Sequence, residues 1–239
     1  LQKAGDVIPD IVSVLKEMRT GKEKTYKFPS HVPECGGDGK IERIPGEAAW
    51  RCVNKNSFAQ QKRKFYHFTS RKAFDIEGLG PKIIDVLLDK QLISSFDNIF
   101  TLKKGDLLSL PRFAEKSVDN LLQATDKARK VTLPRFLIAL SIPQVGEETA
   151  NDLANHFKTI EKVRYATLGE LQGIYGIGDV VARELVEWFK DKNNQKLVDR
   201  LLKHVMIEKV IAPVKSGLQG KSFVITGTLV AMDRDIAQE

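Results

Sequence analysis

The chain is poor in the residues that build disulfide-linked or catalytic metal sites. Its 239 residues include only two cysteines, Cys35 and Cys52, and four histidines. Two cysteines cannot form the disulfide framework of a small secreted protein, and four scattered histidines give no recognisable hydrolase constellation. The sequence also lacks an early apolar run of the length that a signal peptide or a membrane span needs. These absences predict a cytoplasmic protein with no membrane partner.

The charge balance is basic. Lysine and arginine number 38 against 31 aspartates and glutamates, which gives a formal net charge of +7. An excess of this size suits neutralisation of nucleic-acid phosphates, although it does not require it. Hydrophobic residues make up 42% of the chain, enough to bury a core in more than one unit.

Pattern and composition divide the chain into four regions. Residues 1–28 contain an apolar, β-branched run that predicts a strand at a domain edge, followed by a charged linker. Residues 29–61 hold both cysteines and two glycine-rich turns, so they predict a small loop-rich module. Residues 62–208 have helical apolar spacing throughout, interrupted by proline and glycine. Residues 209–239 lead into an apolar strand and predict the start of an α/β domain.

The helical region contains a fourfold repeat. Gly80, Ala114, Gly146 and Gly178 each open a helix after a short turn, at offsets of 34, 32 and 32 residues. Two copies have the complete turn, Gly78-Leu79-Gly80 and Gly176-Ile177-Gly178. The other two, Arg112-Phe113-Ala114 and Gln144-Val145-Gly146, are degenerate. The repeat predicts four hairpins between helices.

Such a turn has a chemical consequence. We expect both glycines to take positive φ and to let a ligand approach the backbone. The amides at the helix N-terminus then favour an anion, and in a basic protein the expected anion is a nucleic-acid phosphate. Two other interpretations stay open. A single copy can be only a helix cap, and a period of 32 to 34 residues is also found in peptide-binding helical scaffolds.

Six stretches in order resemble bacterial NAD-dependent DNA ligases. The run from Thr69 to Gly80 resembles the opening of that family's helix-hairpin-helix domain. The others are Ala4 to Pro9 (end of its OB-fold), Arg51 to Asn54 with Ala59-Gln60 (zinc finger), Arg112 to Ser117, Val145 to Glu147, and Gly220 to Leu229 (start of its BRCT domain). The resemblance spans essentially the whole chain.

The resemblance implies a mainly α fold. A tandem helix-hairpin-helix domain with four hairpins (62–208) would follow a strand from an OB-fold (1–28) and a zinc-finger-like module (29–61), and would precede a truncated α/β BRCT start (209–239). The chain would then be the carboxy-terminal part of a monomeric, nucleoid-associated ligase that seals nicks in double-stranded DNA during replication and repair. Its own role would be to hold the DNA backbone without sequence specificity. The candidate DNA-binding residues are Arg71, Lys72, Gly78, Gly80, Lys82, Arg112, Lys116, Gly146, Gly176 and Gly178.

Two departures concern cofactors. Val32 and Ser57 stand where the family has two of its four zinc cysteines, so only Cys35 and Cys52 match and a bound zinc is doubtful. His31 and His67 could complete a Cys2His2 set. The family's adenylation lysine, in a Lys-x-Asp-Gly motif, is absent, since the one Asp-Gly pair, Asp38-Gly39, has Gly36 at the lysine position.

NAD and magnesium would therefore act through a domain that this chain lacks, and the chain alone is expected to be inactive. Two alternative functions remain at this point. One is a non-catalytic helix-hairpin-helix accessory protein of DNA repair, and the other is a helical scaffold that binds proteins. A Lys-x-Asp-Gly motif upstream in the full gene would separate the ligase from the accessory protein.

Overall fold

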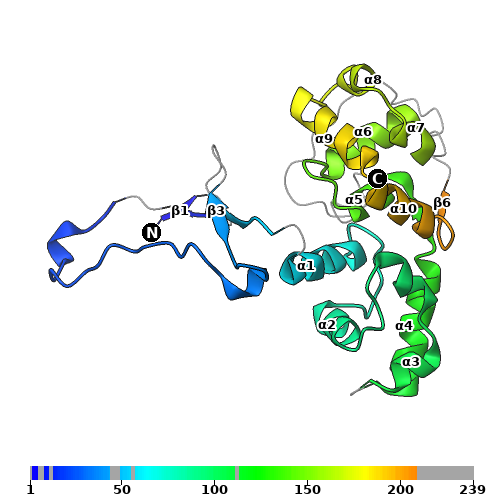
Figure 1. Cartoon of the computed structure of the whole chain (residues 1–239), viewed down its shortest axis with the longest axis horizontal. Coiled ribbons are helices and arrows are strands. Elements are labelled where there is room, and N and C mark those ends of the chain that lie inside the picture. The colour runs from blue at the N-terminus through cyan, green and yellow to red at the C-terminus, as the bar shows by residue number, and fades with distance from the viewer. Residues whose placement is uncertain are drawn as a thin grey trace, which may run out of the picture. The chain divides into compact units, whose positions relative to one another are not determined.

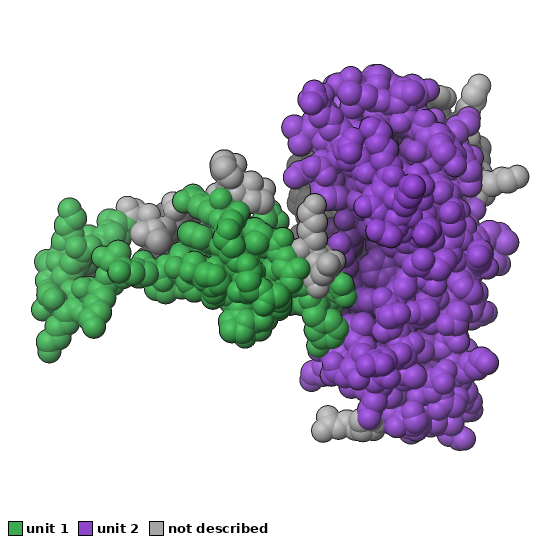
Figure 2. All heavy atoms as spheres, viewed as in Figure 1, with its two compact units in different colours: residues 1–63 green, residues 64–239 purple. Residues whose placement is uncertain are grey.

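A computed structural model describes residues 13–43, 49–54, 57–110 and 113–208, and the backbone of residues 2–4 and 8–10. The expected BRCT start at 209–239 and the candidate Arg112 lie outside the described residues. The chain divides into two compact units, residues 1–63 and 64–239 (Figure 2). Each is described by itself.

The first unit consists of short strands and turns. Antiparallel strands β1 (Gln2–Ala4) and β2 (Ile8–Asp10) pair with each other, as do β3 (Ile41–Arg43) and β4 (Trp50–Cys52). Two 3-10 turns, η1 (Lys16–Met18) and η2 (Pro33–Cys35), lie between the pairs. Gly39 has φ +70° and an added Cβ would lie 2.9 Å from the Val32 carbonyl oxygen, so only glycine fits this loop.

The second unit is helical, as the sequence predicts. Helix α1 (Phe58–Thr69) leads into it from the first unit. The following elements are α2 (Pro81–Asp89), η3 (Phe96–Thr101), α3 (Lys104–Leu108), α4 (Glu115–Lys127), β5 (Lys130–Thr132), α5 (Leu133–Ala139), α6 (Glu147–Phe157), α7 (Ile160–Arg164), α8 (Leu168–Gln172), α9 (Asp179–Lys190), α10 (Lys192–Leu201) and β6 (Met206–Glu208).

These helices form a tandem repeat of helix-hairpin-helix pairs. The pairs α1–α2 and α3–α4 make the first half, and α5–α6 and α8–α9 make the second. The same backbone contact also recurs at the start of the first helix in two of the pairs. Before α3, the Lys103 amide donates to the Asp106 carboxylate at 2.9 Å. Before α8, 64 residues later, the Thr167 amide donates to the Glu170 carboxylate at 2.7 Å. In Figure 1, α2 to α4 lie at one end of this unit and α6 to α9 at the other.

A continuous apolar core runs through the second unit. Phe68 is fully buried and stacks on Phe74 and Phe96, with ring centroids 4.4 and 4.5 Å apart. Such aromatic pairs add to the free energy gained by burying their area. The core then continues through the apolar faces of α5, α6 and α9. No helix among the described residues is both long and apolar enough to cross a bilayer.

The last described strand of the second unit, β6, pairs with β5 in the middle of that unit. β5 and β6 pair in parallel, with Val131 opposite Ile207. Arg129 reinforces this pairing, because its guanidinium donates to the carbonyl oxygens of Phe100 at 2.6 Å and His204 at 3.1 Å. The two halves of the repeat are therefore held together by the chain that follows the last hairpin.

Candidate nucleic-acid interface

The four turns share one backbone hydrogen bond. In each, the amide of the middle apolar residue donates to the carbonyl oxygen three residues earlier: Leu79 to Ile76 at 3.1 Å, Phe113 to Leu110 at 3.4 Å, Val145 to Ile142 at 3.2 Å, and Ile177 to Ile174 at 3.1 Å. Leu79 and Ile177 are buried, and Phe113 and Val145 pack against the core as partly buried residues. The two turns with a degenerate sequence therefore keep the hydrogen bond of the complete ones.

The two glycines of a turn have different roles, and the expectation that both take positive φ is wrong. Only the first position does, with φ of +83° at Gly78 and +87° at Gly176. In the third hairpin Gln144 has φ +62° and takes the same conformation without glycine. This residue was missed from the sequence, because glutamine gives no warning of a left-handed backbone.

The second position is extended in every hairpin. Gly80, Ala114, Gly146 and Gly178 have φ of −81°, −90°, −94° and −77°, values open to any residue. An added Cβ at each of these three glycines would meet no atom within 4 Å. Neither strain nor internal packing explains a glycine here. What a missing side chain does provide is room for a partner outside the chain to reach the backbone.

The same four residues are the N-caps of helices α2, α4, α6 and α9, and none of them makes a side-chain capping hydrogen bond. By contrast Thr159, Thr167 and Asp191 cap α7, α8 and α10 with their side chains. The first amides of a helix need acceptors. At the hairpins these amides are left for water or for an anion.

Charge is unequal among the hairpins. The first turn of α2 has no acidic residue and carries the exposed Lys82, and α4 carries the exposed Lys116 beside Glu115. The first turns of α6 and α9 contain only acids among their charged residues: Glu147 and Glu148, and Asp179. The first pair of hairpins is thus the better anion site by charge.

The hairpins are numbered 1 to 4 in chain order, by the helix starts at Gly80, Ala114, Gly146 and Gly178. An ion pair links hairpins 1 and 3. The Lys72 ammonium lies 3.0 Å from the Glu147 carboxylate, so Lys72 neutralises one of the acids that would repel a phosphate. Arg135 on α5 donates to the carbonyl oxygens of Arg71 at 2.7 Å and Ala73 at 2.8 Å. Its guanidinium holds the segment before hairpin 1 in place.

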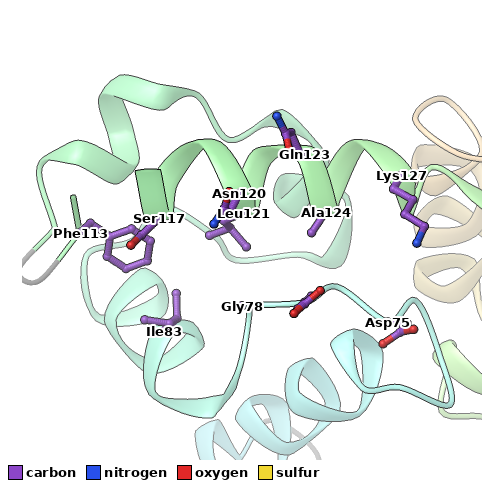
Figure 3. A pocket seen from close by; sticks show the side chains of 11 residues that line it. Asp75, Gly78, Ile83, Phe113, Ser117, Asn120, Leu121, Gln123, Ala124 and Lys127 are labelled. Carbon is purple, nitrogen blue, oxygen red and sulfur yellow. The ribbon is translucent and has the colours of Figure 1, made fainter. Parts of the chain in front are cut away.

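The candidate residues that the structure describes are all exposed, namely Arg71, Lys72, Gly78, Gly80, Lys82, Lys116, Gly146, Gly176 and Gly178. Two hairpins of the first half also border one groove with a cavity volume of about 750 Å³. Figure 3 shows Gly78 and Asp75 on one side and the α4 side chains Ser117, Asn120 and Lys127 on the other. Polar side chains therefore line the space beside the first hairpin.

The cysteine module brings together its two thiols. Cys35 ends the η2 turn, Cys52 ends β4, and the Cys52 thiol lies 3.8 Å from the Cys35 carbonyl oxygen. The hydrogen bond between the thiols raises the pKa of Cys35 to about 11, so this residue stays protonated at neutral pH. Burial raises the pKa of Cys52, but its hydrogen bonds with Cys35, Asn54, Ser57 and Gln60 outweigh burial and lower it.

The donor set does not fit a structural zinc ion. Ser57, fully buried, bonds to Cys52, and Val32 precedes Cys35 in the same turn, so the four positions of the resemblance do lie in one module. Valine has no ligand atom, and two thiols and a hydroxyl are not the Cys/His set that zinc requires. No group of three or more histidine, cysteine or acidic side chains suited to a metal occurs in the described part of the chain.

The two histidines offered as replacement ligands have other neighbours in the structure. His31 is exposed at the bridge to Lys40. The Nδ1 atom of His67, in α1, is 2.9 Å from the Ser141 hydroxyl. Their role as zinc ligands stays a prediction.

Comparison with known proteins agrees with the geometry. Residues 70–127 match the model of the SAM-like helix-hairpin-helix tandem, and residues 135–198 match that of the helix-hairpin-helix motif. The whole chain is 40% identical to a DNA ligase of Carboxydothermus hydrogenoformans and spans 36% of its length. Over its full length the chain is thus similar to a segment of this DNA ligase, and its helical region matches helix-hairpin-helix models.

Proposed function

We propose that residues 64–208 hold double-stranded DNA by its phosphates near a nick, as the DNA-binding part of an NAD-dependent ligase that seals such nicks in replication and repair. The observation that carries this proposal is the fourfold repeat of exposed helix N-termini without side-chain caps, each behind a turn with the same backbone hydrogen bond. The name of the relative supports the assignment to a ligase.

The contacts in this proposal are to the DNA backbone. Helix N-terminal amides and the ammonium groups of Lys82 and Lys116 recognise phosphate oxygens, which are the same at every base pair. Glycine at the second turn position lets a phosphate approach the amides closely. Binding therefore carries no sequence preference, and the first pair of hairpins supplies most of the charge.

The chemistry of ligation lies elsewhere in this proposal. The resemblance to NAD-dependent ligases implies a lysine that takes AMP from NAD, and magnesium in the later steps. The motif of that lysine is absent from all 239 residues. The chain by itself is thus expected to bind DNA as a monomer, without becoming adenylylated and without sealing nicks.

The test is the salt dependence of binding. Fluorescently labelled duplexes of two unrelated sequences, intact and nicked, are titrated with the chain at several salt concentrations. We expect equal affinity for both sequences, and a slope of log K against log salt of about −0.9 for each phosphate neutralised. A slope near zero, or no binding, contradicts the proposal.

A second measurement places the chemistry. The chain is incubated with NAD labelled in its AMP part, and a denaturing gel is examined for covalent label. No label is expected. A labelled lysine would show that the adenylation site lies in this chain, and would contradict the division of roles proposed above.

A further inference from the structure

The fourth hairpin carries an aromatic side chain at its tip. Tyr175 lies between buried Ile174 and Gly176, three residues before the N-cap Gly178, and its exposed fraction is 99%. The corresponding residues of hairpins 1, 2 and 3 are Glu77, Pro111 and Pro143. Hairpin 4 therefore differs from the other three in carrying an aromatic ring beside its turn.

The folded chain gives no reason for this ring. At 99% exposure it contributes almost nothing to the core. The turn itself is held by the Ile177 amide, which donates to the Ile174 carbonyl at 3.1 Å, and by the left-handed backbone of Gly176. Because the turn does not depend on the tyrosine, its ring is available to a partner.

The electrostatics of hairpin 4 point to an uncharged contact. Asp179 is the acid of the first turn of α9, and its carboxylate is held by Arg183 at 2.9 Å and by the Gln172 amide at 2.9 Å. The first turn of α9 contains an acid and no free cation, whereas the first turn of α2 contains Lys82 and no acid. Hairpin 4 therefore attracts phosphates less than hairpin 1 does. A ring beside the turn can instead pack on the uncharged part of a nucleotide, its sugar and base.

We propose that Tyr175 packs its ring against the sugar and base next to the phosphates at hairpin 4, and so supplies affinity that does not depend on salt. This inference rests on the proposed function, since it requires that the hairpins bind DNA. On this proposal the two halves of the repeat bind DNA differently. Hairpins 1 and 2 bind mainly through charge, and hairpin 4 binds through an aromatic contact.

The test compares Tyr175→Ala and Tyr175→Phe with wild type in the same duplex titration. We expect Tyr175→Ala to weaken binding about tenfold at every salt concentration and to leave the salt slope unchanged, because no counterion is released by a neutral ring. Tyr175→Phe keeps the ring and should bind like wild type. Thermal midpoints of all three should coincide, because the side chain is outside the core.

Tyr165→Ala is the matched control. This tyrosine is also strongly exposed, at 76%, but it ends α7 in the connection between hairpins 3 and 4. Its removal should leave affinity unchanged. A direct readout is Tyr175→Trp, whose added fluorescence should be quenched by DNA after the signal of Trp50 and Trp188 in wild type has been subtracted.

Four results separate this inference from the proposed function. If wild type binds DNA with a steep salt slope and Tyr175→Ala binds equally well, the aromatic contact is refuted and the proposed function stands. If Tyr175→Phe binds as weakly as Tyr175→Ala, the hydroxyl and not the ring makes the contact. If Tyr175→Ala lowers the slope, the substitution has changed the phosphate contacts. Either result refutes the aromatic contact. If wild type does not bind DNA, both fail together.

Discussion

Arg200 and Asp97 join the two halves of the helix-hairpin-helix repeat across 103 residues of sequence. The Arg200 Nε atom lies 3.0 Å from Asp97 Oδ1, and its second guanidinium nitrogen donates to the Ser95 hydroxyl at 2.9 Å. Asp97 belongs to η3 in the first half, and Arg200 belongs to α10, which follows the last hairpin. The pair thus sets where the second pair of hairpins sits relative to the first.

Removing the charge of Asp97 should destabilise this body. Asp97 is only 7% exposed, so Asp97→Asn leaves Arg200 beside a neutral amide and should cost about 1–3 kcal/mol of unfolding free energy. Denaturant unfolding at pH 7 measures this. Glu187→Gln, in an exposed ion pair with Lys190 on α9, is the control and should cost less than about 1 kcal/mol.

The same pair predicts a pH dependence. Burial raises the pKa of Asp97, but hydrogen bonds from Ser95 and Arg200 and the Arg200 charge outweigh burial and hold the pKa below its ordinary range. A depressed folded pKa gives stability that is complete above the unfolded pKa of about 3.9 and is lost as pH falls through the folded pKa. The gap between wild type and Asp97→Asn should therefore be constant from pH 7 to pH 5 and should shrink below about pH 4. A gap that grows as the pH falls below about 4 would contradict this assignment.

Valine substitutions should separate the two glycines of hairpin 4. Gly178→Val places its side chain in open space at φ −77°, so the free energy of unfolding should change by less than about 1 kcal/mol while DNA affinity falls. Gly176→Val forces a β-branched residue to φ +87°, which should cost about 1–3 kcal/mol. Chemical denaturation and duplex titration of both variants measure these effects.

Gly105→Ala is the control for the glycine variants. It lies in α3, where an added Cβ also meets nothing within 4 Å, but α3 precedes its hairpin turn instead of following it. DNA affinity should be unchanged. If Gly178→Val binds DNA as tightly as wild type, the hairpins are helix caps and the phosphate contacts are refuted.

The charge of Lys82 should contribute to DNA binding, whereas the charge of Lys190 should not. No ion pair within the described residues holds Lys82, which lies at the start of α2, whereas Lys190 pairs with Glu187 at the far end of α9. Lys82→Gln should reduce the salt slope of DNA binding by about 0.9. Lys190→Gln should leave the slope unchanged. Equal slopes for wild type and both variants would show that hairpin 1 does not contact a phosphate.

The cysteine module should bind zinc only after its ligands are restored. Wild type has only two thiols in this module, so elemental analysis of protein purified without chelator should find less than stoichiometric zinc. Val32→Cys with Ser57→Cys places four thiols in one module and should create a tight site. Stoichiometric zinc in wild type would contradict the expectation and would point to His31 or His67 as a replacement ligand. If the double variant binds none, the loops have a different geometry from the family's zinc finger.

Local patterns in the sequence predicted the repeated part of the fold. The recurrence of Gly80, Gly146 and Gly178, each directly before a stretch of helical apolar spacing, indicates helices joined by equivalent turns. The backbone of Gln144 could not be predicted, since its left-handed conformation is imposed by the surrounding hairpin. The ion pair between Arg200 and Asp97 could not be predicted from the sequence either, because two charged residues 103 positions apart produce no periodic pattern.

The parallel pairing of β5 and β6 has a consequence during protein synthesis. The partner of Lys130 in this pairing is Met206, 76 residues later in the chain. Synthesis of these residues takes roughly 4–15 seconds at about 5–20 residues per second, so β5 cannot pair before then. During that time α1 to α4 can already pack around the phenylalanines of the first half, while β5 remains an unpaired edge. The emerging chain therefore assembles its charged pair of hairpins first. Closure of the whole body depends on its last nine described residues, from Arg200 to Glu208, so that a nascent chain stopped before Met206 would expose a strand edge open to intermolecular pairing.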